Sequence, residues 1–264
     1  MNGFGPLEAL QAFFIFTTGV VYLLVGARLG SRSVPQDAAS ASRLFALWWF
    51  GVGLYTLSGV VQLSLFRIGI WDIVIHMTVV FSALLIVFIA LWGLVYYLLF
   101  VYTGDERLLP ATLAFYVVLY VAVVYYIVQS GPQAVAMQGG EVVVVYRDPP
   151  QGLAERVLVG VVIGVPLLSA AAYASLLLRA SGRSQRYRIG LVSATIMVWL
   201  GTGLLINLFF GLDTVLGHIV SRAIGLLAAL VVLMAFFPPQ WVQERFDVET
   251  VRGFPERPGL AEED

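Results

Sequence analysis

Seven long apolar stretches constrain this chain more than any other feature. They cover residues 7–29, 45–66, 70–102, 111–129, 154–178, 189–212 and 214–237. About 20 mainly apolar residues suffice for a helix to cross a bilayer, and backbone groups in hydrocarbon must find partners within a helix or a closed barrel. We therefore expect an all-α polytopic membrane protein, a seven-transmembrane helix bundle that crosses the cell membrane as a multi-pass protein.

Composition agrees with this expectation and narrows the possible functions. Apolar residues make up 60% of the 264 residues and charged residues only 12%, about half the share found in soluble domains. We expect the lipid bilayer as a partner and, because no basic run is present, no nucleic acid. The chain has neither cysteine nor lysine, which excludes disulfides, thiol chemistry and a lysine Schiff base. No nucleophile–base pair or phosphate-binding loop is visible, so we expect no enzyme.

The arginines predict the orientation of the bundle. Eleven of them fall on one side of the expected spans, namely Arg28, Arg32, Arg43, Arg107, Arg179, Arg183, Arg186, Arg188, Arg245, Arg252 and Arg257. The other side holds Arg67, Arg147 and Arg156, and Arg222 lies inside a span. Because cytoplasmic loops are enriched in basic residues, we expect the N-terminus outside and the C-terminus in the cytoplasm.

Two segments outside the spans also carry predictions. Residues 134–147 predict a small extracellular β-hairpin around a Gly-Gly turn, which acts either as a lid or docking surface or as an ordered connector. Pro238 and Pro239 predict the end of the last helix, since proline lacks the N–H that a helix needs. Residues 1–239 are thus expected to form the transmembrane domain, and residues 240–264 a cytoplasmic juxtamembrane segment with a disordered tail.

A short motif occurs twice and suggests an internal repeat. Its residues are Trp49, Gly51 and Gly53 in the second span, and Trp199, Gly201 and Gly203 in the sixth. We interpret all six as structural, because glycine lets neighbouring helices approach closely. The first repeat then covers about 7–102, the linker helix 111–129 and the second repeat about 154–237. A single linking span makes this 3+1+3 arrangement a parallel repeat; the alternative is a chance resemblance between glycine-rich helices.

Polar residues at similar depth in several spans form the candidate site. They are Asp72, His76, His218, Arg222, Gln62, Asn207 and Asp213. Near the start of the third and seventh spans, each of the chain's two histidines follows an aspartate, Asp72 four residues before His76 and Asp213 five before His218. The spacing of Asp72 and His76 places them on one helical face. An arginine inside a span faces protein or water rather than lipid, so Arg222 is the strongest functional signal.

Three interpretations of this cluster stay open. The first is a ligand-binding or proton-sensing pocket, because histidine changes charge near neutrality. The second is a cofactor site in which His76 and His218 ligate a haem iron or a metal; the metal signal is weak, because no histidine pair at ligand spacing is present. In the third, the aspartates cap helices, the histidines bond backbone groups and Arg222 only stabilises the fold.

Seven spans with an outside N-terminus and a 3+1+3 repeat resemble the microbial rhodopsins. That family carries its retinal on a lysine in the seventh span, where this chain has only His218 and Arg222, so a retinal pigment is excluded. The segment from Ala235 to Phe246 resembles the exit of the seven-helix sensor modules that precede bacterial histidine kinases and cyclases. That resemblance implies a sensor that signals through a partner.

These observations favour a non-enzymatic seven-helix receptor or sensor with a ligand- or proton-responsive pocket in the outer half. Its expected partners are an unidentified small ligand and a cytoplasmic or membrane signalling protein, and a homo-oligomer stays open. The first alternative is a small-solute or proton-coupled transporter. The second is a membrane protein that binds haem through two histidines, although no cofactor is required by the favoured function.

Overall fold

The structure is a computed structural model that describes residues 5–31, 39–138, 141–148, 153–180, 182–205 and 215–246. Within these ranges the long helices are α1 (Pro6–Gly30), α2 (Ala39–Arg67), α3 (Ile73–Thr103), α4 (Leu108–Gln129), α5 (Leu153–Ser175), α6 (Arg183–Leu205) and α7 (Val215–Phe236). The short elements are strands β1 (Pro132–Gln138) and β2 (Glu141–Tyr146), the 3-10 turn η1 (Leu176–Leu178) and helix α8 (Gln240–Phe246).

Six of the described helices are long and apolar enough to cross a membrane: α1 to α5, the last together with η1, and α7. The chain is therefore a helical protein embedded in a membrane. Helix α6 is not among the six. Its first two turns carry three arginines, and the expected sixth span continues past Leu205 into residues outside the described ranges.

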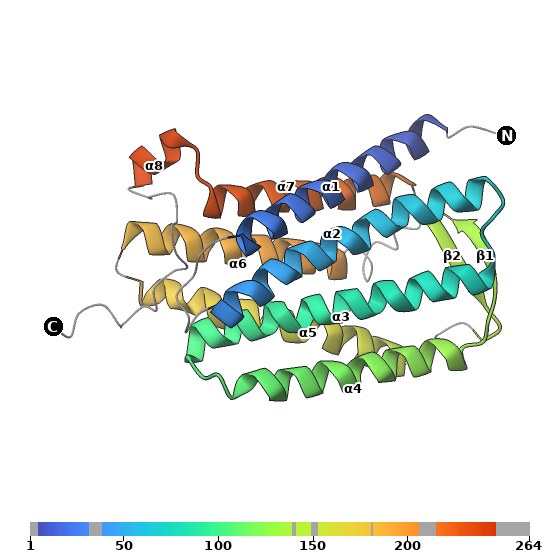
Figure 1. Cartoon of the computed structure of the whole chain (residues 1–264), viewed down its shortest axis with the longest axis horizontal. Coiled ribbons are helices and arrows are strands. Elements are labelled where there is room, and N and C mark those ends of the chain that lie inside the picture. The colour runs from blue at the N-terminus through green and yellow to red at the C-terminus, as the bar shows by residue number, and fades with distance from the viewer. Residues whose placement is uncertain are drawn as a thin grey trace.

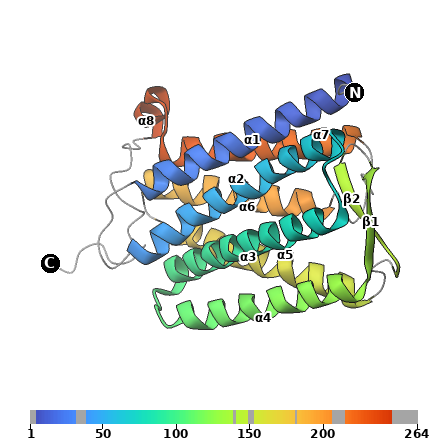
Figure 2. The same ribbon diagram turned by 45° about the vertical axis from the view of Figure 1, so that its right-hand side comes forward.

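Most of the long helices form a closed ring. Each of α1, α2, α3, α5, α6 and α7 contacts the next in this order, and α7 contacts α1 again. Helix α4 lies outside the ring against α3 (Figure 1). In the turned view of Figure 2, α1 crosses in front of α7 at one side of the bundle. All seven helices run between two ends, which we name the hairpin end and the α8 end.

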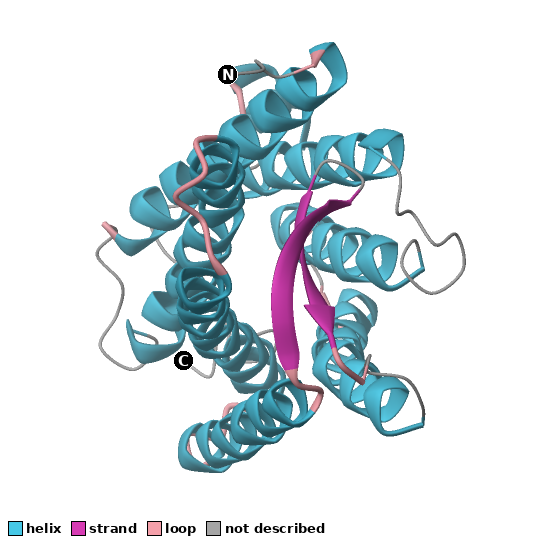
Figure 3. Ribbon diagram, turned by 90° about the vertical axis from the view of Figure 1, so that its right-hand side faces the viewer, coloured by secondary structure: helices cyan, strands magenta, loops and turns pink. Residues whose placement is uncertain are grey.

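The two strands cover the hairpin end. They pair antiparallel, from Gln138 opposite Glu141 to Pro132 opposite Tyr146, with an irregularity between Pro132 and Ala134. Strand β2 contacts α2 and β1 contacts α3. Figure 3 looks at this end and shows the strands lying across the middle of the helix ring. The hairpin is thus placed over the interior of the bundle and not beside it.

Close backbone contacts hold α1, α2 and α3 together. A Cβ atom added at Gly93 of α3 would lie 2.6 Å from the carbonyl oxygen of Leu44 on α2. At Gly53 of α2 the corresponding distance to the backbone nitrogen of Leu23 on α1 is 2.9 Å. Lipid gives helices no hydrophobic reason to associate, so such small-residue contacts supply much of the packing attraction.

Aromatic side chains fill the half of the ring nearer the α8 end. Phe45 of α2 stacks on Tyr97 of α3 with ring centroids 4.2 Å apart, and it also lies 5.7 Å from the ring of Phe236 on α7. Tyr22 of α1 packs on Trp49 of α2 at 5.4 Å. All five side chains are buried, so this half of the bundle is a packed core.

The close contact at Gly93 between α2 and α3 leads to a testable prediction. We expect Gly93→Ala to destabilise the protein by about 1–3 kcal/mol, because the Leu44 carbonyl is backbone and can move aside only with its helix. Gly160→Ala on α5 is the matched control, since nothing lies within 4 Å of a Cβ at that position. Reversible unfolding in mixed detergent micelles measures both variants. Equal stability of the two would contradict the close approach of α2 and α3.

Candidate functional site

A cavity of about 220 Å³ lies inside the ring toward the hairpin end. We name it the upper cavity. Gln62 of α2, His76 of α3 and Arg222 of α7 line it together, and Val142 of strand β2 also contributes to its wall. Three of the seven polar residues singled out from the sequence therefore meet at one place, although they come from three different helices.

The imidazole of His76 has a fixed orientation in the wall of the upper cavity. Its Nδ1 accepts a hydrogen bond of 2.9 Å from the indole Nε1–H of Trp71, and the side chain is only 2% exposed. In a neutral histidine whose Nδ1 is an acceptor, the proton lies on Nε2. Within the described part of the chain, Nε2 has no hydrogen-bond partner. His76 therefore offers one N–H donor to the cavity.

Arg222 is positioned by contacts between α7 and α1. The Thr18 hydroxyl donates a hydrogen bond of 3.4 Å to the carbonyl oxygen of Arg222, and the Tyr22 hydroxyl donates one of 2.9 Å to that of Gly225. These bonds hold one face of α7 against α1. Arg222 also lines the upper cavity, as expected for an arginine within a membrane span, which faces protein or water rather than lipid.

A second cavity, of about 310 Å³, lies next to the first, on the side toward the α8 end. We name it the lower cavity. Arg222, Tyr55 and Thr56 line both cavities, so the two adjoin at these residues. Apolar side chains, among them Leu91, Val162 and Leu200, form much of the lower wall. The interior therefore changes from polar near the hairpin end to apolar near the middle of the bundle.

Tyr55 and Thr56 were missed in the sequence, although a signal for Tyr55 was present. Tyr55 precedes Gln62 by seven residues, which places both on one face of a helix. The Thr56 hydroxyl donates a 2.8 Å hydrogen bond to the Val52 carbonyl of its own helix. Whether Thr56 lines a cavity thus depends on how α2 is rotated about its axis within the ring.

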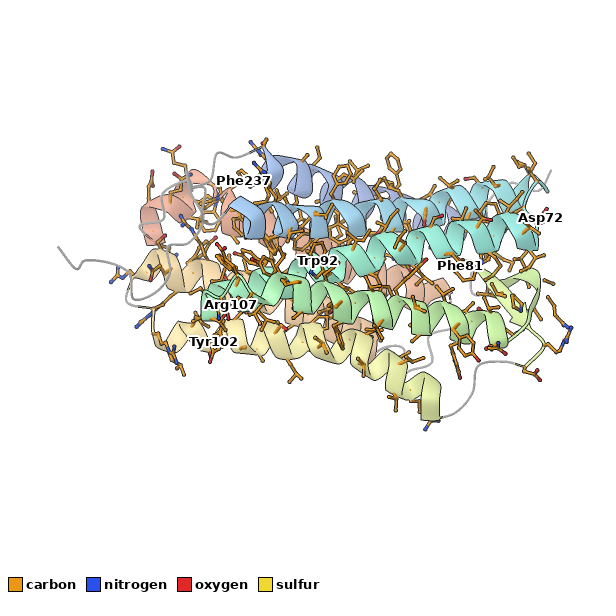
Figure 4. All side chains as sticks on the ribbon, turned by 60° about the horizontal axis from the view of Figure 1, so that its bottom comes forward. Asp72, Phe81, Trp92, Tyr102, Arg107 and Phe237 are labelled. Carbon is orange, nitrogen blue, oxygen red and sulfur yellow. The ribbon has the colours of Figure 1, made fainter. Side chains whose placement is uncertain are left out.

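Asp72 lies away from both cavities. Its carboxylate accepts a hydrogen bond of 2.8 Å from the Ile75 backbone N–H and so caps α3. As the capping residue, it has an extended backbone, with φ −117° and ψ 177°, so the helical spacing that would place it beside His76 does not apply. Figure 4 shows Asp72 at the tip of the hairpin end. The helix-cap interpretation therefore describes this residue best.

The remaining candidates fall partly or wholly outside the described residues. Asn207 and Asp213 lie beyond the described ranges. His218 belongs to α7, but its side chain is not among those described, and the same holds for Trp199, Gly201 and Gly203 of α6. The shared pocket for both histidines stays a prediction. Haem ligation by His76 and His218 stays one too, and a Soret band in the purified protein tests it.

The structural candidates on α2 lie in packed surroundings. Trp49 is 2% exposed and belongs to the aromatic core. A Cβ atom at Gly51 would lie 2.9 Å from the Ala90 Cβ of α3. Helix α7 ends at Phe236, and Pro238 and Pro239 separate it from α8. In the described ranges, no group of three or more histidine, aspartate or glutamate side chains is arranged to hold a metal ion.

Comparison with protein-family models, with curated proteins and with solved structures gives no match. The geometry of the cavities is therefore what bears on function.

The contact between Trp71 and His76 predicts a single histidine tautomer. We expect the Nδ1 of His76 to be unprotonated and Nε2 protonated in the neutral side chain, because the indole N–H occupies Nδ1. Trp71→Phe removes that donor and should give a mixture of tautomers. Histidine ¹⁵N chemical shifts measure this in reconstituted protein. Trp92→Phe is the control, since the Trp92 indole bonds to Thr112 instead. An unchanged tautomer in Trp71→Phe would contradict the assignment.

Proposed function

We propose that the chain is a non-enzymatic seven-helix membrane receptor or sensor that binds a small ligand in the upper cavity. The observation that carries this proposal is the meeting of Gln62, His76 and Arg222 in one cavity beneath the hairpin. Polar side chains are costly inside a membrane span, and ligand sites typically combine an apolar wall with a few convergent polar groups.

The ligand we propose is a small carboxylate. The upper cavity offers three hydrogen-bond donors on different helices: the guanidinium of Arg222, the Nε2–H of His76 and the amide NH₂ of Gln62. Carboxylate oxygens only accept hydrogen bonds, and arginine binds them with two parallel bonds. The adjoining lower cavity, with Leu91 and Leu200 in its wall, is apolar enough to bind a short alkyl chain attached to that carboxylate.

The proposed topology places the hairpin outside the cell and the α8 end in the cytoplasm. Two described ranges at the α8 end, around Arg179–Arg188 and Arg245, carry the arginine excess that supports this orientation. Figure 4 places Tyr102 and Arg107 at that same end, opposite Asp72. The ligand would then enter from outside, past β2.

The order of the helix ring supports a parallel repeat as part of the proposal. If α1, α2 and α3 correspond to α5, α6 and α7, then the contact of α3 with α5 corresponds to the contact of α7 with α1. Both contacts occur in the ring, and α4 lies outside it as a linker would. The ligand site then lies close to the proposed symmetry axis, where the two halves meet.

The proposed signal runs along α7. Arg222 lies about two turns into this helix, and α8 follows its far end after Pro238 and Pro239. At that end the Tyr187 hydroxyl of α6 donates a hydrogen bond of 3.1 Å to the Met234 carbonyl, and the Arg28 guanidinium lies 4.5 Å from the centre of the Phe237 ring. A rotation or shift of α7 on ligand binding would change these contacts, which a cytoplasmic or membrane partner can read.

Binding of simple carboxylates tests the site. We expect butyrate or hexanoate to raise the unfolding temperature of the protein in neutral detergent, whereas the matching alcohols do not. Arg222→Gln removes the charged partner of the carboxylate. Hydrogen bonds to a charged group contribute about 1.5–3 kcal/mol, so this variant should bind the carboxylate more weakly by about tenfold or more. His76→Ala should weaken it less. The control is Arg156→Gln, an exposed arginine of α5 that lines neither cavity.

Full retention of carboxylate binding in both Arg222→Gln and His76→Ala would contradict this site. Binding of the alcohols with equal strength would contradict the carboxylate, because the apolar lower cavity alone would then account for the affinity.

Two adjoining cavities at successive depths favour one further candidate, a small-solute transporter. The aromatic core formed by Tyr22, Phe45, Trp49, Tyr97 and Phe236 closes the path toward the α8 end in this structure. A transporter must open that core, whereas a receptor need not. Uptake of labelled butyrate into proteoliposomes separates the two functions: flux that Arg222→Gln abolishes indicates transport, and binding without flux indicates a receptor.

A further inference from the structure

A basic groove lies at the α8 end of the bundle. Its volume is about 480 Å³, and its lining consists of Arg183, Arg186 and Tyr187 of α6 together with Arg245 of α8. It is remote from both cavities, which share none of these residues. Two separate elements thus bring three guanidinium groups to one place, although like charges repel.

Fixed contacts build this groove. The Nε–H of Arg186 donates a hydrogen bond of 2.8 Å to the carbonyl of Ala180, which follows η1 and its capping residue Arg179, and this bond orients the guanidinium group. On α8, the side-chain amide of Gln243 donates a 2.7 Å hydrogen bond to the Pro238 carbonyl, and Val242 is 2% exposed. Helix α8 is therefore anchored against the bundle, and Arg245 is held near α6.

Among the described residues, the wall of the groove contains three arginines and no carboxylate. Within the described part of the chain, Arg183, Arg186 and Arg245 form no ion pair with an acidic side chain. The ion pair that the described residues do contain joins Arg67 and Glu8 at the hairpin end. An anion in the groove would offset the repulsion among the three guanidinium groups.

The groove also adjoins the ends of two candidate membrane spans. Helix α6 begins just after the membrane span that ends at Leu178, and α8 begins just after the span that ends at Phe236. Trp241 of α8 is 61% exposed, and tryptophan side chains gather at the headgroup level of membranes. A phosphate at this level would come within reach of the arginines.

We propose that this groove binds the phosphate of an anionic phospholipid headgroup. Guanidinium groups bind phosphate oxygens with paired hydrogen bonds, and basic pockets at the cytoplasmic end of membrane helices suit anionic lipids. The lipid would join α6 and α8 through its phosphate and so fix the segment that follows α7. This site is independent of the carboxylate site, and neither proposal requires the other.

Lipid titration of the purified full chain in neutral detergent micelles tests the groove. We expect phosphatidylglycerol to raise the unfolding temperature, and phosphatidylcholine and inorganic phosphate to have little effect. The double variant Arg183→Gln/Arg245→Gln should bind phosphatidylglycerol about tenfold more weakly. The control Arg147→Gln/Arg156→Gln removes the same amount of charge on the opposite side of the expected membrane spans. It should bind phosphatidylglycerol as the unchanged protein does.

The groove variant has a conservative counterpart, which matters if loss of both arginines prevents folding. Arg183→Lys/Arg245→Lys keeps the charge but not the paired hydrogen bonds. Its affinity for phosphatidylglycerol should therefore fall between that of the unchanged protein and that of the double glutamine variant. Equal weakening in the control, or full binding in both groove variants, would overturn the proposal. Inorganic phosphate acting as well as the lipid would overturn the lipid assignment and indicate a free phosphate ligand. Equal action of phosphatidylcholine would overturn the preference for anionic lipid.

Discussion

Hydrocarbon offers no hydrogen-bond partner, and the rest of this structure depends on that constraint. Backbone groups of a span must be satisfied within the helix, which gives the long helices α1 to α7 their form. The same constraint acts on small polar side chains. The hydroxyls of Thr56, Ser169 and Thr195 each donate to a carbonyl one turn earlier in their own helix. Such residues add no polar surface that a neighbouring helix must match.

Larger polar groups cannot be satisfied in this way, and three of them meet inside the ring. The Arg222 guanidinium, the Gln62 amide and the His76 imidazole all line the upper cavity. The opposite half of the ring contains the aromatic core around Phe45 and Tyr97. The bundle is therefore divided along its axis into a half that contains the two cavities and a half that is tightly packed.

The sequence was most informative where local chemistry decides structure, and least informative about which residues meet. Asp72 illustrates the limit: it shares its spacing to His76 with a true helical pair, but it lies at the capping position, where the backbone is extended. Tyr55 illustrates the reverse, because its spacing to Gln62 was available, but a single tyrosine within an apolar stretch does not by itself indicate a site. The carboxylate and phospholipid proposals both follow from such meetings of residues from different helices.

The sequence by itself determined that the chain is a helical membrane protein, because apolar stretches of this length have no other stable form in lipid. It also indicated which polar residues are costly within a membrane span. Only the tertiary structure decided that α3 contacts α5 while α4 lies outside the ring, and that Gln62, His76 and Arg222 line one cavity. The physical reason is that the rotation of each helix about its own axis depends on contacts with other helices. Contacts such as that of Tyr22 with Gly225 set how each helix turns about its axis, and these contacts join residues about two hundred positions apart.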